Sequence, residues 1–306
     1  MNATTDAANT RVAVLGIGIM GSAMARNLIR AGLPTTVWDR SAGATTALAD
    51  AGAQVASSPA EAVAGAKTVI TMLPNADVVS SVMSDETAEA FADQAAWAQM
   101  GTIGFAATSQ IAGHLHQLRP DVMFVDAPVS GSKGPAEHGQ LLILASGPLA
   151  AQPVVGPAFD AIGRKTVWLG EAGAGSRMKL AVNAYMSILI EGLAEALELA
   201  DLLDIDQTKL ADAIEGGPLD APIADAKLHK MEEGDYAPEF PLEWALKDVD
   251  LALQAAGSDA LPVLAALSRQ WRSAVEAGHG REDFSAARLA LNDGSRRSAT
   301  GADSSR

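Results

Sequence analysis

The sequence predicts an α/β fold, with a doubly wound, largely parallel sheet followed by a second, all-helical domain. Short β-branched runs alternate with alanine-rich segments up to about residue 169, and beyond about residue 172 only helical periodicity remains. A glycine-rich turn directly follows the first apolar run. Strand–helix alternation is typical of a parallel sheet covered by helices on both faces.

The alternating half contains six strand-like runs rich in Val, Ile, Leu and Thr. They occupy residues 11–15, 35–38, 68–72, 123–126, 141–145 and 166–169. Four helices are predicted between them, at residues 20–31, 45–51, 59–64 and 109–119. We therefore expect residues 11–171 to form the first domain, after a disordered tail at residues 1–10.

The sequence after about residue 172 is predicted to form helices, followed by a disordered Ser/Arg/Gly/Asp-rich tail at residues 293–306. The expected helices cover residues 176–203, 207–215, 221–233, 242–256 and 261–277. The helix that begins at Ser176 is long and apolar almost all round. We therefore expect most of its faces to be buried, either between domains or in a subunit interface. Residues 172–292 then form the second, helical domain.

Charge and composition narrow the classes of partner. The 22 Lys and Arg against 37 Asp and Glu give a net charge of −15, which argues against nucleic acid or an anionic membrane as partner but leaves room for a small anionic substrate. No cysteine is present, which excludes disulfides, thiolate catalysis and cysteine-ligated metals. The first ten residues lack an apolar core, and no uncharged run of about twenty apolar residues occurs. We expect a cytoplasmic protein.

The first chemical motif is the G-x-G-x-x-G at residues 16–21, between a strand and a helix. Gly16 permits a tight turn, Gly18 lets the backbone approach a pyrophosphate, and Gly21 allows close helix–strand packing. Ile19 and Met20 then begin the helix, whose free N–H groups favour phosphate. The alternative is a plain glycine turn between packed elements. The context favours dinucleotide binding.

The second strand is followed by Asp39, Arg40 and Ser41. An acid here bonds the adenosine ribose hydroxyls and favours NAD. Arg40, with Ser41 as a further donor, is placed to bind a 2′-phosphate and favours NADP. Because the guanidinium–phosphate contact is strong and the aspartate can turn away, we favour NADP and keep NAD as the alternative.

A third motif, residues 126–132, closes the strand at 123–126. Its turn, with Ser130 and Gly131 at the centre, offers hydroxyl and backbone N–H groups to an anion. Ligands bind at the carboxyl ends of strands in open α/β sheets. An ordinary turn that caps the next element would look the same in sequence.

Lys179 and Asn183 lie four residues apart near the start of the long helix, so they share one face. An ammonium and an amide aimed at one carbonyl oxygen protonate and hold it. The alternative for Lys179 is a solvated lysine at a helix start, which the apolar character of this helix disfavours.

These motifs together resemble the β-hydroxyacid dehydrogenase family, which includes 3-hydroxyisobutyrate dehydrogenases, and most of all its glyoxylate/succinic semialdehyde reductases. The resemblance spans residues 11–291. It rests on residues 16–21, 73–75, 126–139, 173–183, 240–242 and 247–248. Several ordered motifs with matching separations are far more specific than any one.

The resemblance implies a Rossmann domain, a long interdomain helix and a helical domain that dimerises. Lys179 would be the catalytic proton donor and acceptor and Asn183 would orient the substrate. Further substrate contacts would come from Ser130, Gly131, Thr102 and Phe240. The cofactor would be contacted by Leu73, Pro74, Thr102 and Lys247, with Asp248 shaping the same wall, and no metal would be needed.

Three departures from the family pattern leave the substrate open. Ala184 stands where a second asparagine is frequent, and Gly101 where a serine commonly precedes the residue matching Thr102. The loop at residues 216–220 also differs from the usual turn of small residues. Three alternatives are kept: an imine reductase, which usually has another residue at the place of Lys179; a 6-phosphogluconate dehydrogenase, which is longer; and a non-catalytic dinucleotide-binding scaffold or sensor, which need not retain a proton donor.

Overall fold

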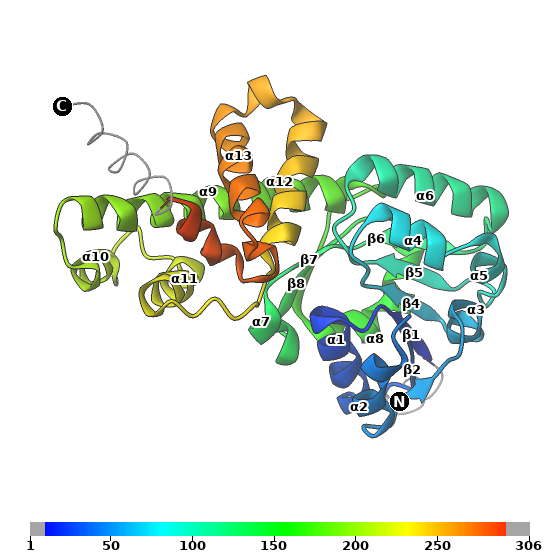
Figure 1. Ribbon diagram of the computed structural model, residues 1–306. Helices are drawn as coiled ribbons and strands as arrows, with labels where there is room; N and C mark the ends of the chain where they lie inside the picture. Colours follow the sequence, from blue (N-terminus) through cyan, green and yellow to red (C-terminus); the bar gives the residue numbers. More distant parts are fainter. Residues whose placement is uncertain (1–9, 292–306) are drawn as a thin grey trace. The chain divides into compact units, whose positions relative to one another are not determined.

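A computed structural model describes residues 10–291 of the chain (Figure 1). Packing divides it into two units, the first ending at Lys179 and the second beginning at Leu180. The boundary falls inside α9 (Ala174–Leu202), so one helix belongs to both units. The predicted tails, apart from Thr10, lie outside the described residues.

The first unit contains a six-stranded, all-parallel sheet in the order β3-β2-β1-β4-β5-β6. Its strands are β1 (Val12–Leu15), β2 (Thr35–Trp38), β3 (Gln54–Val55), β4 (Thr68–Thr71), β5 (Ala96–Gln99) and β6 (Met123–Asp126). This order confirms the predicted Rossmann fold. The strand order reverses between β1 and β4, and in such sheets ligands bind beyond the carboxyl ends of the strands at that reversal.

The sequence-based strand assignment was incomplete in this unit. β5 was missed because two of its four residues are alanine, which is depleted in strands, and none is β-branched. Its burial between β4 and β6 decides its state. β3 was missed as well. The runs at 141–145 and 166–169 are strands, β8 (Leu141–Ala145) and β9 (Gly163–Trp168), but with β7 (Val129–Ser130) they form a separate three-stranded sheet.

Two apolar layers cover the faces of the large sheet. Alternate residues of β1 point to opposite faces. Val12 and Val14 pack in the layer that includes α1 (Ile19–Arg30) and α8 (Gln152–Ile162). Ala13 and Leu15 pack in the other layer. Its helices are α3 (Pro59–Val63), α4 (Ala76–Val82), α5 (Asp85–Glu89) and α6 (Phe105–Leu118) (Figure 1).

Several short helices differ from expectation. The predicted helix at 45–51 is a 3-10 turn at Ala42–Thr45 followed by α2 (Thr46–Ala49). The sequence patterns did not reveal α4, α5, α7 (Lys133–Glu137) or α8. Most of these have too few residues for a helical period to become visible.

The second unit is helical within the described residues. It holds the rest of α9, then α10 (Gln207–Ile214), α11 (Pro222–Glu233), α12 (Leu242–Ala256) and α13 (Pro262–Glu276). These bounds confirm the helices expected from periodicity. Their shared core includes Ile190, Leu197, Leu246 and Trp271. Trp271 is fully buried and meets Phe284 edge to face, with ring centroids 6.1 Å apart.

One side of α9 is exposed in the single chain, and burial of that side in a subunit interface, one of the two expectations above, stays a prediction. Its exposed apolar residues recur at helical spacing and so form one stripe: Met178, Tyr185, Ile188, Leu199 and Leu202. Within residues 10–291, α9 alone is long and apolar enough to cross a membrane by length and composition, with a mean hydropathy of 1.4 over its best window. Core helices of globular proteins meet the same test, and 44% of that window is buried inside the protein.

A buried carboxylate lies on the covered side of α9. Glu191 is 7% exposed and accepts a 2.6 Å hydrogen bond from Nε1 of Trp271. Burial raises the pKa of Glu191 to about 7, opposed by the Trp271 bond and reinforced by the negative charge of Glu195. In the unfolded chain the carboxyl has its ordinary pKa, near 4.5.

This carboxyl makes folding stability pH dependent. Because the folded-state pKa is the higher one, its favourable contribution is complete below pH 4.5 and is lost as pH rises through 7. We expect the free energy of unfolding to fall by about 3 kcal/mol across that window. Glu191→Gln, which keeps an acceptor for Trp271, should flatten the dependence. Urea unfolding at a series of pH values measures it, with the exposed Glu276→Gln on α13 as control. Parallel curves for Glu191→Gln and wild type would assign the effect elsewhere.

Candidate active site

The predicted site residues of the first unit follow the carboxyl ends of five neighbouring strands. Gly16 follows β1, Asp39 follows β2, and Leu73 and Pro74 come soon after β4. Thr102 follows β5, and Ser130 follows β6. Because parallel strands end at one edge of the sheet, the residues directly after these strands lie along that edge, where open α/β sheets bind ligands. Ser130 is four residues beyond β6 and ends β7 of the smaller sheet.

The glycines of the first loop are required by their surroundings. Gly16 has φ +96°, and a Cβ there would lie 2.4 Å from the carbonyl oxygen of Met72. A Cβ on Gly21 would lie 1.9 Å from the carbonyl oxygen of Gly16. At Gly18, by contrast, a Cβ would meet nothing within 4 Å. The first and last glycines therefore serve packing, and the middle one faces open space.

That open space fits a pyrophosphate. α1 begins directly after Gly18, no described side chain caps it, and its first turn holds no acidic residue. Its first N–H groups and the positive end of its dipole therefore remain for an anion. The residues present thus suit the dinucleotide that the motif predicts.

Asp39 is bound by the backbone around it. One carboxylate oxygen accepts from the N–H of Ile17 at 2.7 Å, and the other accepts from the N–H of Ser41 at 2.8 Å. Asp39 thus fixes the glycine loop to the end of β2. Arg40 is exposed. Asp39, predicted to favour NAD, thus directly precedes the exposed Arg40, predicted to favour NADP.

The loops after β1 and β5 pack against residues 72 and 73 at the end of β4. A Cβ on Gly101 would lie 2.4 Å from the Leu73 carbonyl oxygen, so glycine has a steric reason at this position. Gln99, which sequence reasoning missed, closes the same turn with two 2.8 Å hydrogen bonds to the backbone of Gly101. This arrangement fixes the half-buried Thr102.

The Ser130–Gly131 turn is also sterically defined. Gly131 has φ +137°, and a Cβ there would lie 2.9 Å from Cδ2 of Leu141 and 3.1 Å from Cβ of Pro135. Ser132 begins α7 without a side-chain cap. The hydroxyl and N–H groups of this turn are therefore held by a conformation that only glycine adopts readily.

Lys179 and Asn183 are both buried, 8% and 2% exposed, one turn apart on α9. Nδ2 of Asn183 donates to Asp248 Oδ2 at 2.6 Å, and Asp248 Oδ1 lies 3.0 Å from Nζ of Lys247. Among the described residues, Oδ1 of Asn183 is buried without a hydrogen-bond partner. The carboxylate of Asp248 thus fixes the amide of Asn183, a contact that the sequence patterns did not reveal.

Phe240 is held separately in the second unit. Its backbone N–H donates to Oδ2 of the fully buried Asp283 at 3.2 Å, and its ring lies 5.5 Å from that of Phe284. Asp283 also accepts from Nζ of the buried Lys227 at 3.0 Å. A buried ion pair therefore positions the segment that carries Phe240.

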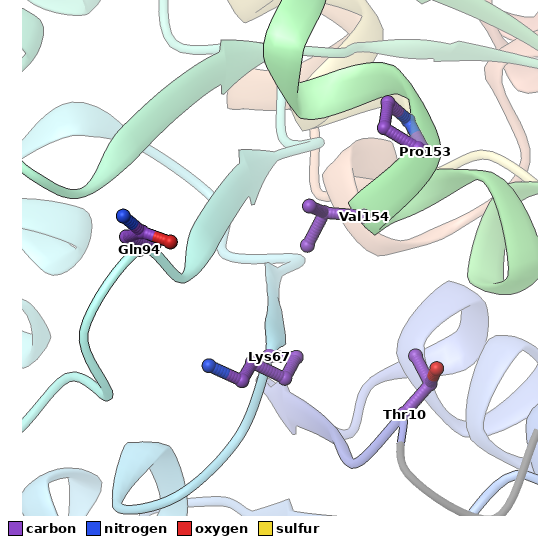
Figure 2. Close-up of a pocket in the computed structure, with 5 residues that line it drawn as sticks. All are labelled: Thr10, Lys67, Gln94, Pro153 and Val154. Carbon is purple, nitrogen blue, oxygen red and sulfur yellow. The ribbon is translucent and has the colours of Figure 1, made fainter. Parts of the chain in front are cut away.

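A hollow of about 230 Å³ lies near the amino ends of the strands, opposite the predicted site (Figure 2). It is lined by Thr10, Lys67, Gln94, Pro153 and Val154. Thr10, Lys67 and Gln94 come before β1, β4 and β5, so this hollow is at the amino ends of the strands and is no part of the predicted site. Within residues 10–291, no group of three or more His, Asp or Glu side chains is placed to hold a metal ion.

Comparison with known proteins agrees with this geometry. The NAD binding domain of 6-phosphogluconate dehydrogenase matches residues 11–170. The NAD-binding domain of NADP-dependent 3-hydroxyisobutyrate dehydrogenase matches residues 173–291. The fold and the glycine loop thus define an NAD(P)-binding oxidoreductase.

Relatives make the assignment narrower. Glyoxylate/succinic semialdehyde reductase 1 of Arabidopsis thaliana is 37% identical over 90% of this chain and 96% of its own. The 3-sulfolactaldehyde reductase of Escherichia coli K12 is 34% identical over 90% and 93%. A 3-hydroxyisobutyrate dehydrogenase structure from Salmonella typhimurium superposes with a TM-score of 0.84 at 29% identity, over 92% and 99%. The chain belongs to the β-hydroxyacid dehydrogenase family and is an NAD(P)-dependent oxidoreductase of that family.

Proposed function

We propose that this protein is a cytoplasmic, NADPH-dependent reductase of short aldehyde acids, of the glyoxylate or succinic semialdehyde type, that oxidises β-hydroxyacids in reverse. The observation that carries the proposal is a buried lysine, Lys179, on the same helix face as the buried amide of Asn183. The similarity to reductases of glyoxylate, succinic semialdehyde and 3-sulfolactaldehyde supports it.

Each proposed role follows from the chemistry of the side chain. When bound, the reduced nicotinamide supplies a hydride to the aldehyde carbon. Negative charge then develops on the carbonyl oxygen, and the Lys179 ammonium stabilises this charge and donates the proton that completes the alcohol. In the reverse direction neutral Lys179 accepts the hydroxyl proton.

Binding and orientation fall to the other predicted residues. The Ser130 hydroxyl and the N–H of Gly131 bind the substrate carboxylate, and Asn183, oriented by Asp248, bonds the substrate without adding charge. Thr102 and Phe240 line the substrate. We assign cofactor binding to residues 16–21, Asp39, Arg40, Ser41, Leu73, Pro74, Thr102 and Lys247.

A substrate panel tests the proposal. We expect NADPH oxidation with glyoxylate and with succinic semialdehyde, and NADP⁺ reduction with a β-hydroxyacid in reverse. Cyclic imines, assayed in parallel, test the main alternative, which Lys179 disfavours. Turnover of imines alone would replace the reductase assignment. Cofactor binding without turnover of any of these compounds would support a sensor or scaffold.

Arg40 is expected to determine the preference for NADPH. Arg40→Ala should lower kcat/KM for NADPH about tenfold, because a bidentate guanidinium contact to the 2′-phosphate is lost, and should leave the value for NADH within about twofold. Arg164→Ala, which removes another exposed arginine from β9, is the matched control. Equal losses with both cofactors would assign Arg40 to general cofactor binding and remove this argument for NADP.

We also propose a homodimer in which a second copy of the chain covers the exposed stripe of α9. Tyr185 is 71% exposed and Leu199 is 55% exposed on this helix, and an exposed apolar stripe on a soluble protein marks an interaction surface. Light scattering after size-exclusion chromatography should give twice the chain mass. Tyr185→Asp should shift the protein towards the monomer, whereas the same mass for both would place the interface elsewhere.

A further inference from the structure

Asp126 is a fully buried carboxylate at the end of β6. Its Oδ2 accepts from the backbone N–H of Gly173 at 3.1 Å and of Ser176 at 2.8 Å. Its Oδ1 accepts from the Ser176 hydroxyl at 2.7 Å. One carboxylate thus binds the first turn of α9, where the helix leaves N–H groups unsatisfied and where a negative charge is favoured by the dipole.

Ser146 and Thr108 extend this contact. The Ser146 hydroxyl donates to Asp126 Oδ2 at 3.1 Å and accepts from the N–H of Gly175 at 2.9 Å. The Ser176 hydroxyl also forms a 3.1 Å hydrogen bond with the buried Thr108 hydroxyl. Gly175 lies so close that a Cβ there would be 2.3 Å from the Leu144 carbonyl oxygen and 2.8 Å from that of Asp126. The start of α9 is therefore closely packed on the ends of β6 and β8.

The same carboxylate lies between two segments that the proposed chemistry needs. Lys179 follows Ser176 by three residues, within one helical turn. Ser130 follows Asp126 by four residues, and the intervening Ala127 is fixed by a 2.9 Å hydrogen bond to the carbonyl oxygen of Gln99. A shift at Asp126 would therefore displace the proton donor relative to the turn that binds the substrate carboxylate.

We propose that Asp126 is a positioning residue that sets the first turn of α9, and with it Lys179, against the Ser130–Gly131 turn. This inference rests on the proposed function, in which Lys179 is the proton donor. Asp126 touches neither substrate nor cofactor in this assignment. A displacement of about 1 Å at a reacting group costs roughly a hundredfold in rate.

Two substitutions remove the contact by different amounts. Ser176→Ala deletes only the hydroxyl that meets Oδ1, and we expect kcat to fall about tenfold. Asp126→Asn replaces one acceptor oxygen with an amide donor that faces backbone N–H groups, and we expect kcat to fall about a hundredfold. The KM for NADPH should stay within about twofold in both. The double variant should be no worse than Asp126→Asn, because both changes break one network.

Thr68→Val is the matched control. It also deletes one buried hydroxyl, which donates to the Val154 carbonyl oxygen at 2.9 Å, but at the amino edge of the sheet. Its kcat should match that of wild type, and its effect should combine additively with Asp126→Asn. A general loss of rigidity would lower kcat equally in Thr68→Val and Ser176→Ala, which would overturn the positioning role.

A readout without turnover separates this inference from the proposed function. Acetic anhydride labelling across a pH series, quantified for the Lys179 peptide by mass spectrometry, reports the environment of the amine. Ser176→Ala and Asp126→Asn should change the labelling rate and its pH profile at Lys179, and Thr68→Val should not. Unchanged labelling would overturn the positioning role even if the reductase activity is found. Changed labelling at Lys179 in a protein that shows no reductase activity would support the positioning role of Asp126 and refute the proposed reductase function.

Discussion

Replacing Lys179 with methionine is expected to lower kcat for aldehyde reduction about a thousandfold. Methionine fills a similar volume but supplies neither a positive charge nor a proton to the carbonyl oxygen, and general acid catalysis and oxyanion stabilisation are lost together. The KM for NADPH should change little, because Lys179 is assigned no contact to the cofactor phosphates. Steady-state kinetics with glyoxylate and NADPH measures both values.

The control is Lys209→Met, which removes an exposed lysine that pairs with Asp212 at 3.0 Å on α10. It should match wild type within about twofold. A kcat for Lys179→Met within tenfold of wild type would show that another group donates the proton. Tyr185 is not a candidate for that other proton donor, since its side chain is 71% exposed on another face of α9.

Removing the Asp283 carboxylate is expected to produce a large loss of stability. Asp283→Ala should lower the free energy of unfolding by about 3–5 kcal/mol. Lys227, which is 2% exposed, then keeps only one carboxylate partner among the described residues, Glu239 at 3.1 Å. The substitution also removes the acceptor for the backbone N–H groups of Glu239, Phe240 and Ser285. Urea unfolding followed by circular dichroism measures the loss.

Asp250→Ala is the matched control in the same unit. Asp250 pairs with Arg272 at 2.7 Å and accepts from Ser268, but both charged groups of that ion pair reach solvent. Exposed pairs contribute about 0–1 kcal/mol, so the control should lose at most about that amount beyond the Ser268 bond. Equal losses for the two variants would refute the special role of the buried pair.

The candidate site was predictable where one residue type meets a local backbone demand. Gly16 and Gly21 could be predicted from the sequence because the turn and the helix contact leave no room for a Cβ. Both glycines fall within one recognisable motif of six residues. Lys179 and Asn183 were visible because helical spacing puts them on one face. Arg40 and Asp39 were both visible as well, but their opposing preferences leave the choice between NADP and NAD to experiment.

Other positions depend on contacts between distant segments. Asp126 meets Ser176 fifty residues later, and Asp248 meets Asn183 across sixty-five. Local patterns do not encode such pairs. Two signals were available for Asp126: a carboxylate that ends a strand expected to be buried, and a serine at the start of a long helix. Gln99 gave no signal, because its strand contains alanine and glutamine rather than β-branched residues.

The sequence by itself determined the class of fold, the glycine loop, the long helix and the lysine–amide pair on its face. Each of these follows from spacing along the chain, since side-chain periodicity and local turn geometry are short-range properties. The tertiary structure decided that β8 and β9 belong to a separate sheet, that one stripe of α9 is exposed, and which buried carboxylates fix Asn183, Phe240 and the start of α9. Those features depend on burial and on hydrogen bonds between segments that only folding brings together.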